Sequence, residues 1–106
     1  MASLLSRIIG ALTGNSAEPE IPQRGEPVTY EGLSICAAPI KEGSQWRLSG
    51  VIIKQGDEVD LERSFTRADV FYTRAEAESF SVRKGKQIID EQGSKLFESG
   101  EEQARA

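Results

Sequence analysis

Hydrophobic side chains recur with a helical period at the start of the chain. They occupy the i, i+1, i+4, i+5 and i+8 positions within residues 1–13, with small or polar residues on the opposite side. The apolar residues are Leu4, Leu5, Ile8, Ile9 and Leu12. This pattern predicts a short amphipathic helix, which is too short to be stable alone in water and must dock on another surface or fray.

Proline and glycine dominate the next segment, residues 14–27. The segment holds three prolines and two glycines, and Ile21 is its only large apolar residue. This composition predicts a flexible linker between the helix and a folded region.

From Val28 the hydrophobic period changes to two, which is typical of a β-strand. Strand character continues through residues 33–38 and ends at Pro39. Gly32 lies between these stretches and fits either a β-bulge or one half of a Glu31–Gly32 hairpin turn. The pattern does not decide between the two.

Two further strands are predicted at residues 45–54 and 59–65, with a tight turn between them. Trp46 alternates with Leu48 on the apolar side of the first of these strands, so core packing is favoured for the tryptophan over a role as a ligand platform. Strands joined by short connections predict an antiparallel meander over residues 28–66.

A capping-box pattern of Thr73 and Glu76 predicts the start of a helix. The helix is expected to run through Gln92 and to end at Gly93, because glycine suits the left-handed conformation that closes many helices. Its apolar face includes Phe80 and Ile88, which are predicted to pack on the sheet.

The predicted fold class is therefore α+β. Residues 28–97 form one domain, in which three or four antiparallel strands pack against a long C-terminal helix. The short amphipathic helix precedes this domain on its linker, and residues 98–106 are predicted to be a disordered polar tail.

Composition narrows the class of protein. A chain of 106 residues, 38% hydrophobic and 28% charged, has room for one globular core. No apolar run approaches the roughly 20 residues of a membrane-spanning helix, and the single cysteine cannot close an intramolecular disulfide, so a cytoplasmic protein is expected. Histidine is absent and no catalytic motif is present, which predicts a protein that is not an enzyme and holds no cofactor or metal.

The one cysteine, Cys36, lies in an apolar stretch beside two alanines. Packing as a small hydrophobic residue is favoured. The alternative is a redox-sensing thiol, which needs a nearby basic residue to lower its pKa, and none is close in sequence.

Charge is distributed unevenly along the chain. The formal net charge of −4 argues against tight nucleic-acid binding, yet residues 63–86 contain six basic and three acidic residues, a local charge of +3. Arg67 and Asp69 are expected between the last strand and the helix, as a structural pair or as a polar recognition corner with Arg74. Arg83 and Lys86 are expected to project into solvent together, as a solvated surface or a phosphate-binding patch.

Three segments resemble a family of short bacterial proteins named after the haemolysin transcriptional activator HlyU. They are LLSRIIGALTG, VTYEGLSICAAPIKEGSQWRLSGVI and RSFTRADVFYTRAEAESFSVRKGKQIIDEQGSKLF. The third segment, with Arg67, Asp69 and residues 86–93, is the most specific. The resemblance implies a bacterial transcriptional regulator.

The sequence thus favours a small regulatory or interaction module that binds a protein partner or a second copy of itself. The apolar stripe of residues 4–12 is its expected docking element. Direct DNA binding through residues 63–86 is the alternative, although the pattern contains no pair of adjacent helices of the helix-turn-helix kind.

Overall fold

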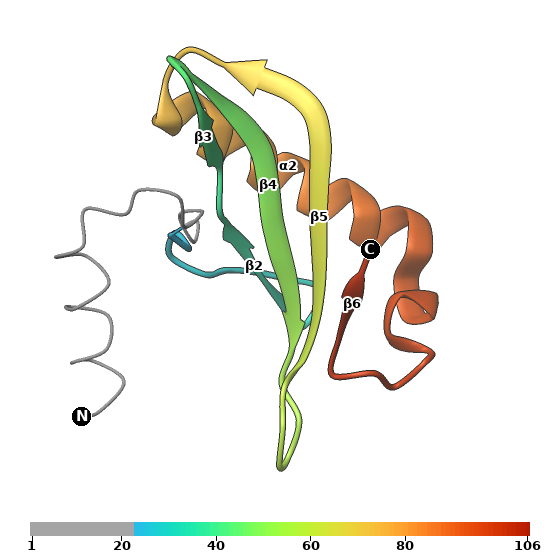
Figure 1. Ribbon diagram of the computed structural model, residues 1–106. Coiled ribbons are helices and arrows are strands. Elements are labelled where there is room, and N and C mark those ends of the chain that lie inside the picture. Colours follow the sequence, from blue (N-terminus) through green and yellow to red (C-terminus); the bar gives the residue numbers. More distant parts are fainter. Residues whose placement is uncertain (1–22) are drawn as a thin grey trace, which may run out of the picture.

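A computed structural model describes residues 23–106 of the chain. These residues form one β-sheet with a long helix, α2 (Arg74–Gln92), across one of its faces (Figure 1). The predicted N-terminal amphipathic helix and most of the predicted linker lie outside the described residues.

The sheet has six strands in the order β1-β2-β4-β5-β6, and β3 pairs with β4 beside β2. All neighbouring strands are antiparallel except β5 and β6, which are parallel. The predicted class, an antiparallel meander with one long helix, is confirmed. The strands are β1 (Val28–Tyr30), β2 (Leu33–Ala37), β3 (Ile40–Glu42), β4 (Gln45–Lys54), β5 (Leu61–Phe71) and β6 (Gln103–Arg105).

A two-residue turn joins β1 to β2. Tyr30 pairs with Leu33, and the residues between them, Glu31 and Gly32, both have positive φ angles, 51° and 78°. Two positive φ angles define the hairpin turn that matches the natural twist of the strands. The hairpin alternative is therefore correct, and the bulge lies elsewhere in the sheet.

The bulge lies in β5, which is longer than predicted. Its pairing with β4 shifts register so that Leu48 of β4 stands opposite residues 67–69 of β5. The prediction that the strand ends at residue 65 was wrong, because polar residues in the bulge interrupt the hydrophobic alternation while the backbone continues to Phe71.

Helix α2 (Arg74–Gln92) begins and ends as predicted. The Thr73 hydroxyl accepts a hydrogen bond from the Glu76 backbone N–H at 3.1 Å. The Glu76 carboxylate in turn accepts from the Thr73 hydroxyl at 3.3 Å. Gly93 has a φ of 53° and its N–H donates to the carbonyl of Ile89, which closes the helix.

Small residues form most of the helix face that meets the sheet. Its buried residues are Ala77, Ser81, Gly85, Ile88 and Ile89. A Cβ atom at Gly85 would lie only 2.6 Å from Cγ2 of Ile35, so glycine permits the close approach of helix and sheet. The prediction that Phe80 packs in this layer was wrong, because its side chain lies at the flank of the helix and is 39% exposed.

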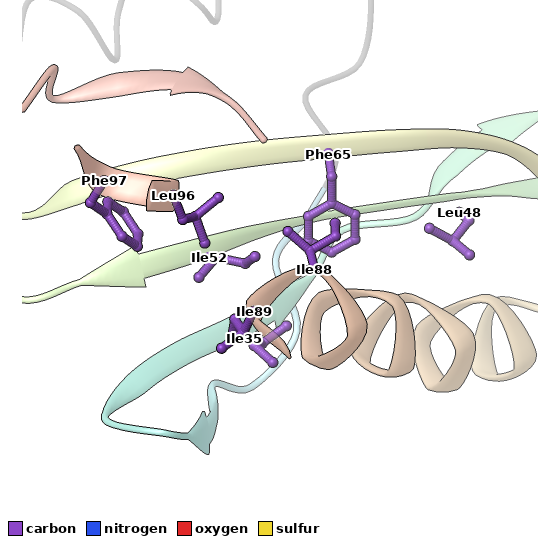
Figure 2. Packing of buried hydrophobic residues seen from close by; sticks show 8 residues of the cluster. All are labelled: Ile35, Leu48, Ile52, Phe65, Ile88, Ile89, Leu96 and Phe97. Carbon is purple, nitrogen blue, oxygen red and sulfur yellow. The ribbon is translucent and has the colours of Figure 1, made fainter. Parts of the chain in front are cut away.

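The hydrophobic core fills the space between sheet and helix, as Figure 2 shows. Its buried members are Ile35, Leu48, Ile52, Phe65, Ile88, Ile89, Leu96 and Phe97. Trp46 is only half-buried, and the cationic groups of Lys41 and Arg74 lie 5.9 and 5.5 Å from the centroid of its ring.

The C-terminal segment is part of the domain rather than the predicted disordered tail. A 3₁₀ turn, η1 (Gly93–Phe97), follows α2 and buries Leu96 and Phe97. The chain then returns as β6 alongside β5, with the Glu62 N–H donating to the Glu102 carbonyl at 2.7 Å. Polar composition concealed this strand, because its backbone pairing needs few apolar side chains.

Candidate interaction surface

The predicted basic stretch of residues 63–86 does not form one surface. Arg63 is only 2% exposed, because it shares the inward face of β5 with Leu61 and Phe65. Its alternation with these two residues was the signal that could have revealed its burial.

Backbone carbonyls surround the buried Arg63 guanidinium. It donates to the carbonyls of Leu96 at 2.8 Å, Glu62 at 2.7 Å and Glu101 at 2.9 Å. It also lies 4.9 Å from the centroid of the Phe97 ring. The side chain therefore fixes the C-terminal segment to β5 and is not available to a partner.

Arg67 and Asp69 lie within β5 and not in the strand-to-helix connection where they were expected. The Arg67 guanidinium donates to the carbonyl of Thr66 at 3.0 Å, and Arg47 donates to the carbonyl of Arg67 at 3.2 Å. Within the described part of the chain the two predicted partners form no ion pair with each other. Both residues belong to the β-bulge of β5. The irregular backbone of a bulge makes the edge of a strand less able to pair with a further strand.

Arg74 occupies the first turn of α2, where a positive charge opposes the helix dipole. Its guanidinium contacts the Glu78 carboxylate at 3.3 Å and donates to the carbonyl of Gln23 at 3.1 Å. It also lies 5.5 Å from the centroid of the Trp46 ring. These contacts give Arg74 a structural role that requires no binding partner.

Arg83 and Lys86 contact different aromatic rings. Arg83 lies 5.2 Å from the ring centroid of Phe80, and Lys86 lies 5.5 Å from that of Tyr30 on β1. The two side chains therefore do not form the joint patch that the sequence suggested. The Tyr30 hydroxyl donates to Asp90 at 2.8 Å, and this bond raises the pKa of the tyrosine.

Exposed apolar side chains gather where β5 leads into α2. Val70 is 37% exposed, Tyr72 79% and Phe80 39%. Phe71 stacks on Phe80 with ring centroids 4.8 Å apart. The Arg83 guanidinium lies over the Phe80 ring. We call this group, residues 70–72, 80 and 83, the β5–α2 corner. Sequence reasoning missed it because the predicted strand ended at residue 65, before these residues, and because the helix period placed Phe80 on the sheet.

An ion pair crosses the sheet face that α2 leaves open. Arg24 donates to both carboxylate oxygens of Glu62, at 3.0 and 2.9 Å, which lowers the pKa of the glutamate. Cys36 lies on this face and is 5% exposed, and burial raises the pKa of its thiol. A raised pKa fits the hydrophobic role of the cysteine and disfavours a reactive thiolate.

Residues 23–106 contain no group of three or more side chains placed to hold a metal ion. None of the helices in this range is long and apolar enough to cross a membrane. Leu4, Leu5, Ile8, Ile9 and Leu12 lie outside the described residues, so their predicted docking role stays a prediction.

The described residues thus form a small α+β domain with a single α-helix and an exposed corner of aromatic and arginine side chains. The family model described as transcriptional activator HlyU matches residues 3–97. The chain belongs to the HlyU family, which supports a regulatory role. No curated protein and no solved structure matches the chain.

Proposed function

We propose that this HlyU-family chain regulates transcription by binding a protein partner, without catalysis and without reading DNA itself. The observation that carries the proposal is the β5–α2 corner. Tyr72 is the most exposed large hydrophobic residue among those described, and its neighbour Phe71 stacks on Phe80, over which Arg83 lies.

The composition of the corner supports protein binding. Tyrosine, phenylalanine and arginine are enriched in the parts of protein interfaces that carry most of the binding energy. The stacking of Phe71 on Phe80 fixes the second ring in place, so little side-chain entropy remains to be lost on binding.

The distribution of charge disfavours direct DNA binding. Arg63 is buried, Arg74 is paired with Glu78, and Arg83 and Lys86 lie over separate rings. Affinity for DNA comes largely from several basic side chains that contact neighbouring phosphates. In residues 23–106, α2 has no second α-helix with which to form a helix-turn-helix.

The proposal is tested with the full chain and three variants. Tyr72→Ala and Phe80→Ala should each reduce retention of a specific protein from a lysate of the native bacterium. Val59→Ala is the matched control, because Val59 is 49% exposed but lies in the distant β4–β5 hairpin. Equal retention by all variants would contradict docking at the corner.

A salt titration with duplex DNA separates the two functions. Direct DNA binding predicts an affinity that falls steeply with salt and weakens in an Arg83→Ala, Lys86→Ala double variant. Protein binding at the corner predicts no measurable affinity for the duplex at physiological salt. Tight, salt-dependent binding that the double variant loses would replace the proposal with the DNA-binding alternative.

A further inference from the structure

The sheet face opposite α2 has no second layer among the described residues. Register assigns the two faces: Ile35 and Ile52 are paired and buried beneath the helix, whereas their neighbours Cys36 and Val51 are paired on the other side. Figure 1 shows the helix on one side of the sheet only. We call the other side the open face.

A shallow cavity of about 480 Å³ lies on the open face. Its lining includes the small residues Ala38, Ser49 and Ser64 together with Val51, and Gln103 and Arg105 of β6 form part of its rim. Small residues allow another element to approach the sheet closely, as Gly85 does on the helix-covered side.

The chain reaches the domain beside this cavity. The Gly25 N–H donates to the carbonyl of Ala37 on β2 at 2.6 Å. From there the Arg24 side chain extends to Glu62 on β5 and lines the cavity. Gln23, the first described residue, accepts a hydrogen bond from Arg74 of α2, so the described chain starts at the sheet edge between α2 and the open face.

We propose that residues 3–12 of the same chain bind in the open-face cavity. Their five aliphatic side chains share one side of a helical pattern and need an apolar surface. A helix of that length is about 15 Å long, and the ten residues that follow it can span up to about 33 Å. Such a tether gives an effective concentration on the order of millimolar, which favours binding within one chain over binding to a second copy.

This inference does not depend on the β5–α2 corner, since the two surfaces share no residue. It assigns the apolar stripe to the protein's own sheet.

The test uses the full chain with the stripe disabled by Leu5→Asp and Ile9→Asp. Ser6→Asp is the matched control, because Ser6 lies opposite the stripe. The double variant should show shifted backbone NMR signals at Val51 and Ser64, two residues that line the cavity. Ser6→Asp should leave both unchanged, and a synthetic peptide of residues 1–13 should reverse the changes in the double variant.

Molecular mass by light scattering distinguishes the source of the segment. Binding within one chain requires the natural protein and the double variant to have the same mass. A dimer that dissociates in the double variant would show that the segment binds a second copy and would overturn the proposal. Unchanged signals at Val51 and Ser64 would overturn it as well, whatever the result at the β5–α2 corner.

Discussion

At the scale of single residues, the arginines of this chain have different roles because the fold places them in different surroundings. Arg63 is enclosed by carbonyls, Arg74 is paired with a carboxylate, and Arg83 lies over an aromatic ring in solvent. A guanidinium has five donors and remains charged at neutral pH, so it can satisfy several carbonyls from one buried position. Only the exposed arginines remain available for recognition.

Replacing Arg63 with Met should therefore destabilise the domain strongly. The carbonyls of Leu96 and Glu101 would lose a charged donor, and we expect the free energy of unfolding to fall by about 2–5 kcal/mol. Urea denaturation measures the loss, and hydrogen exchange should show weaker protection of residues 103–105. Arg67→Met is the control on the same strand, and an equal, small loss in both variants would contradict the role of Arg63.

At the scale of elements, α2 meets the sheet through small residues on one narrow face. Ala77, Ser81 and Gly85 bring the backbone close, and the Ser81 hydroxyl accepts a hydrogen bond from the Ser49 N–H at 3.2 Å. Close approach in the N-terminal half of the helix leaves no space for a phenylalanine ring between the layers. Phe80 is consequently placed at the flank, against Phe71.

Alanine substitutions in α2 should reflect this difference in burial. Ile88→Ala is expected to cost about 2–5 kcal/mol, because Ile88 is 2% exposed. Phe80→Ala should cost only about 1–2 kcal/mol, since the ring is partly in solvent and loses mainly its stacking with Phe71. Urea denaturation of both variants measures the two losses of stability. A larger loss for Phe80→Ala than for Ile88→Ala would show that the Phe80 ring is buried in the core.

At the scale of the whole molecule, the open face of the sheet is crossed by side chains from distant segments. Arg24 precedes the first strand, and Glu62 lies on β5. Their ion pair links the beginning of the described chain to the centre of the sheet. Because about half of the Arg24 side chain is exposed, solvent screening limits the stability that the pair provides.

The Arg24–Glu62 pair predicts a small dependence of stability on pH. The folded-state pKa of Glu62 is lowered by the bond from Arg24, so the contribution is present above the unfolded-state pKa of about 4.3 and is lost as pH falls through the folded-state value. Arg24→Gln should reduce the free energy of unfolding at about pH 7 by at most about 1 kcal/mol.

The same substitution should have a smaller effect at about pH 3, which lies below the pKa of glutamate in the unfolded chain. Urea denaturation at the two pH values measures both differences. Arg83→Gln is the control, since Arg83 forms no ion pair within residues 23–106. An Arg24→Gln effect that is equal at both pH values would rule out a contribution from the charged glutamate.

The sequence by itself determined the elements whose signals are local. The period-two pattern of β4, the capping box at Thr73 and the glycine at position 93 depend on neighbours along the chain, and each was confirmed. The α+β class followed from the order of these elements. The HlyU resemblance was likewise carried by contiguous segments and agrees with the family match.

Only the tertiary structure decided how distant segments use their side chains and backbone edges. The pairing of β6 with β5, the carbonyls around Arg63 and the exposure of Phe80 depend on residues that are far apart in sequence. A strand pattern places a side chain on one of two faces but does not reveal what covers that face. The β5–α2 corner and the open face therefore result from tertiary packing and could not be predicted from the local hydrophobic period.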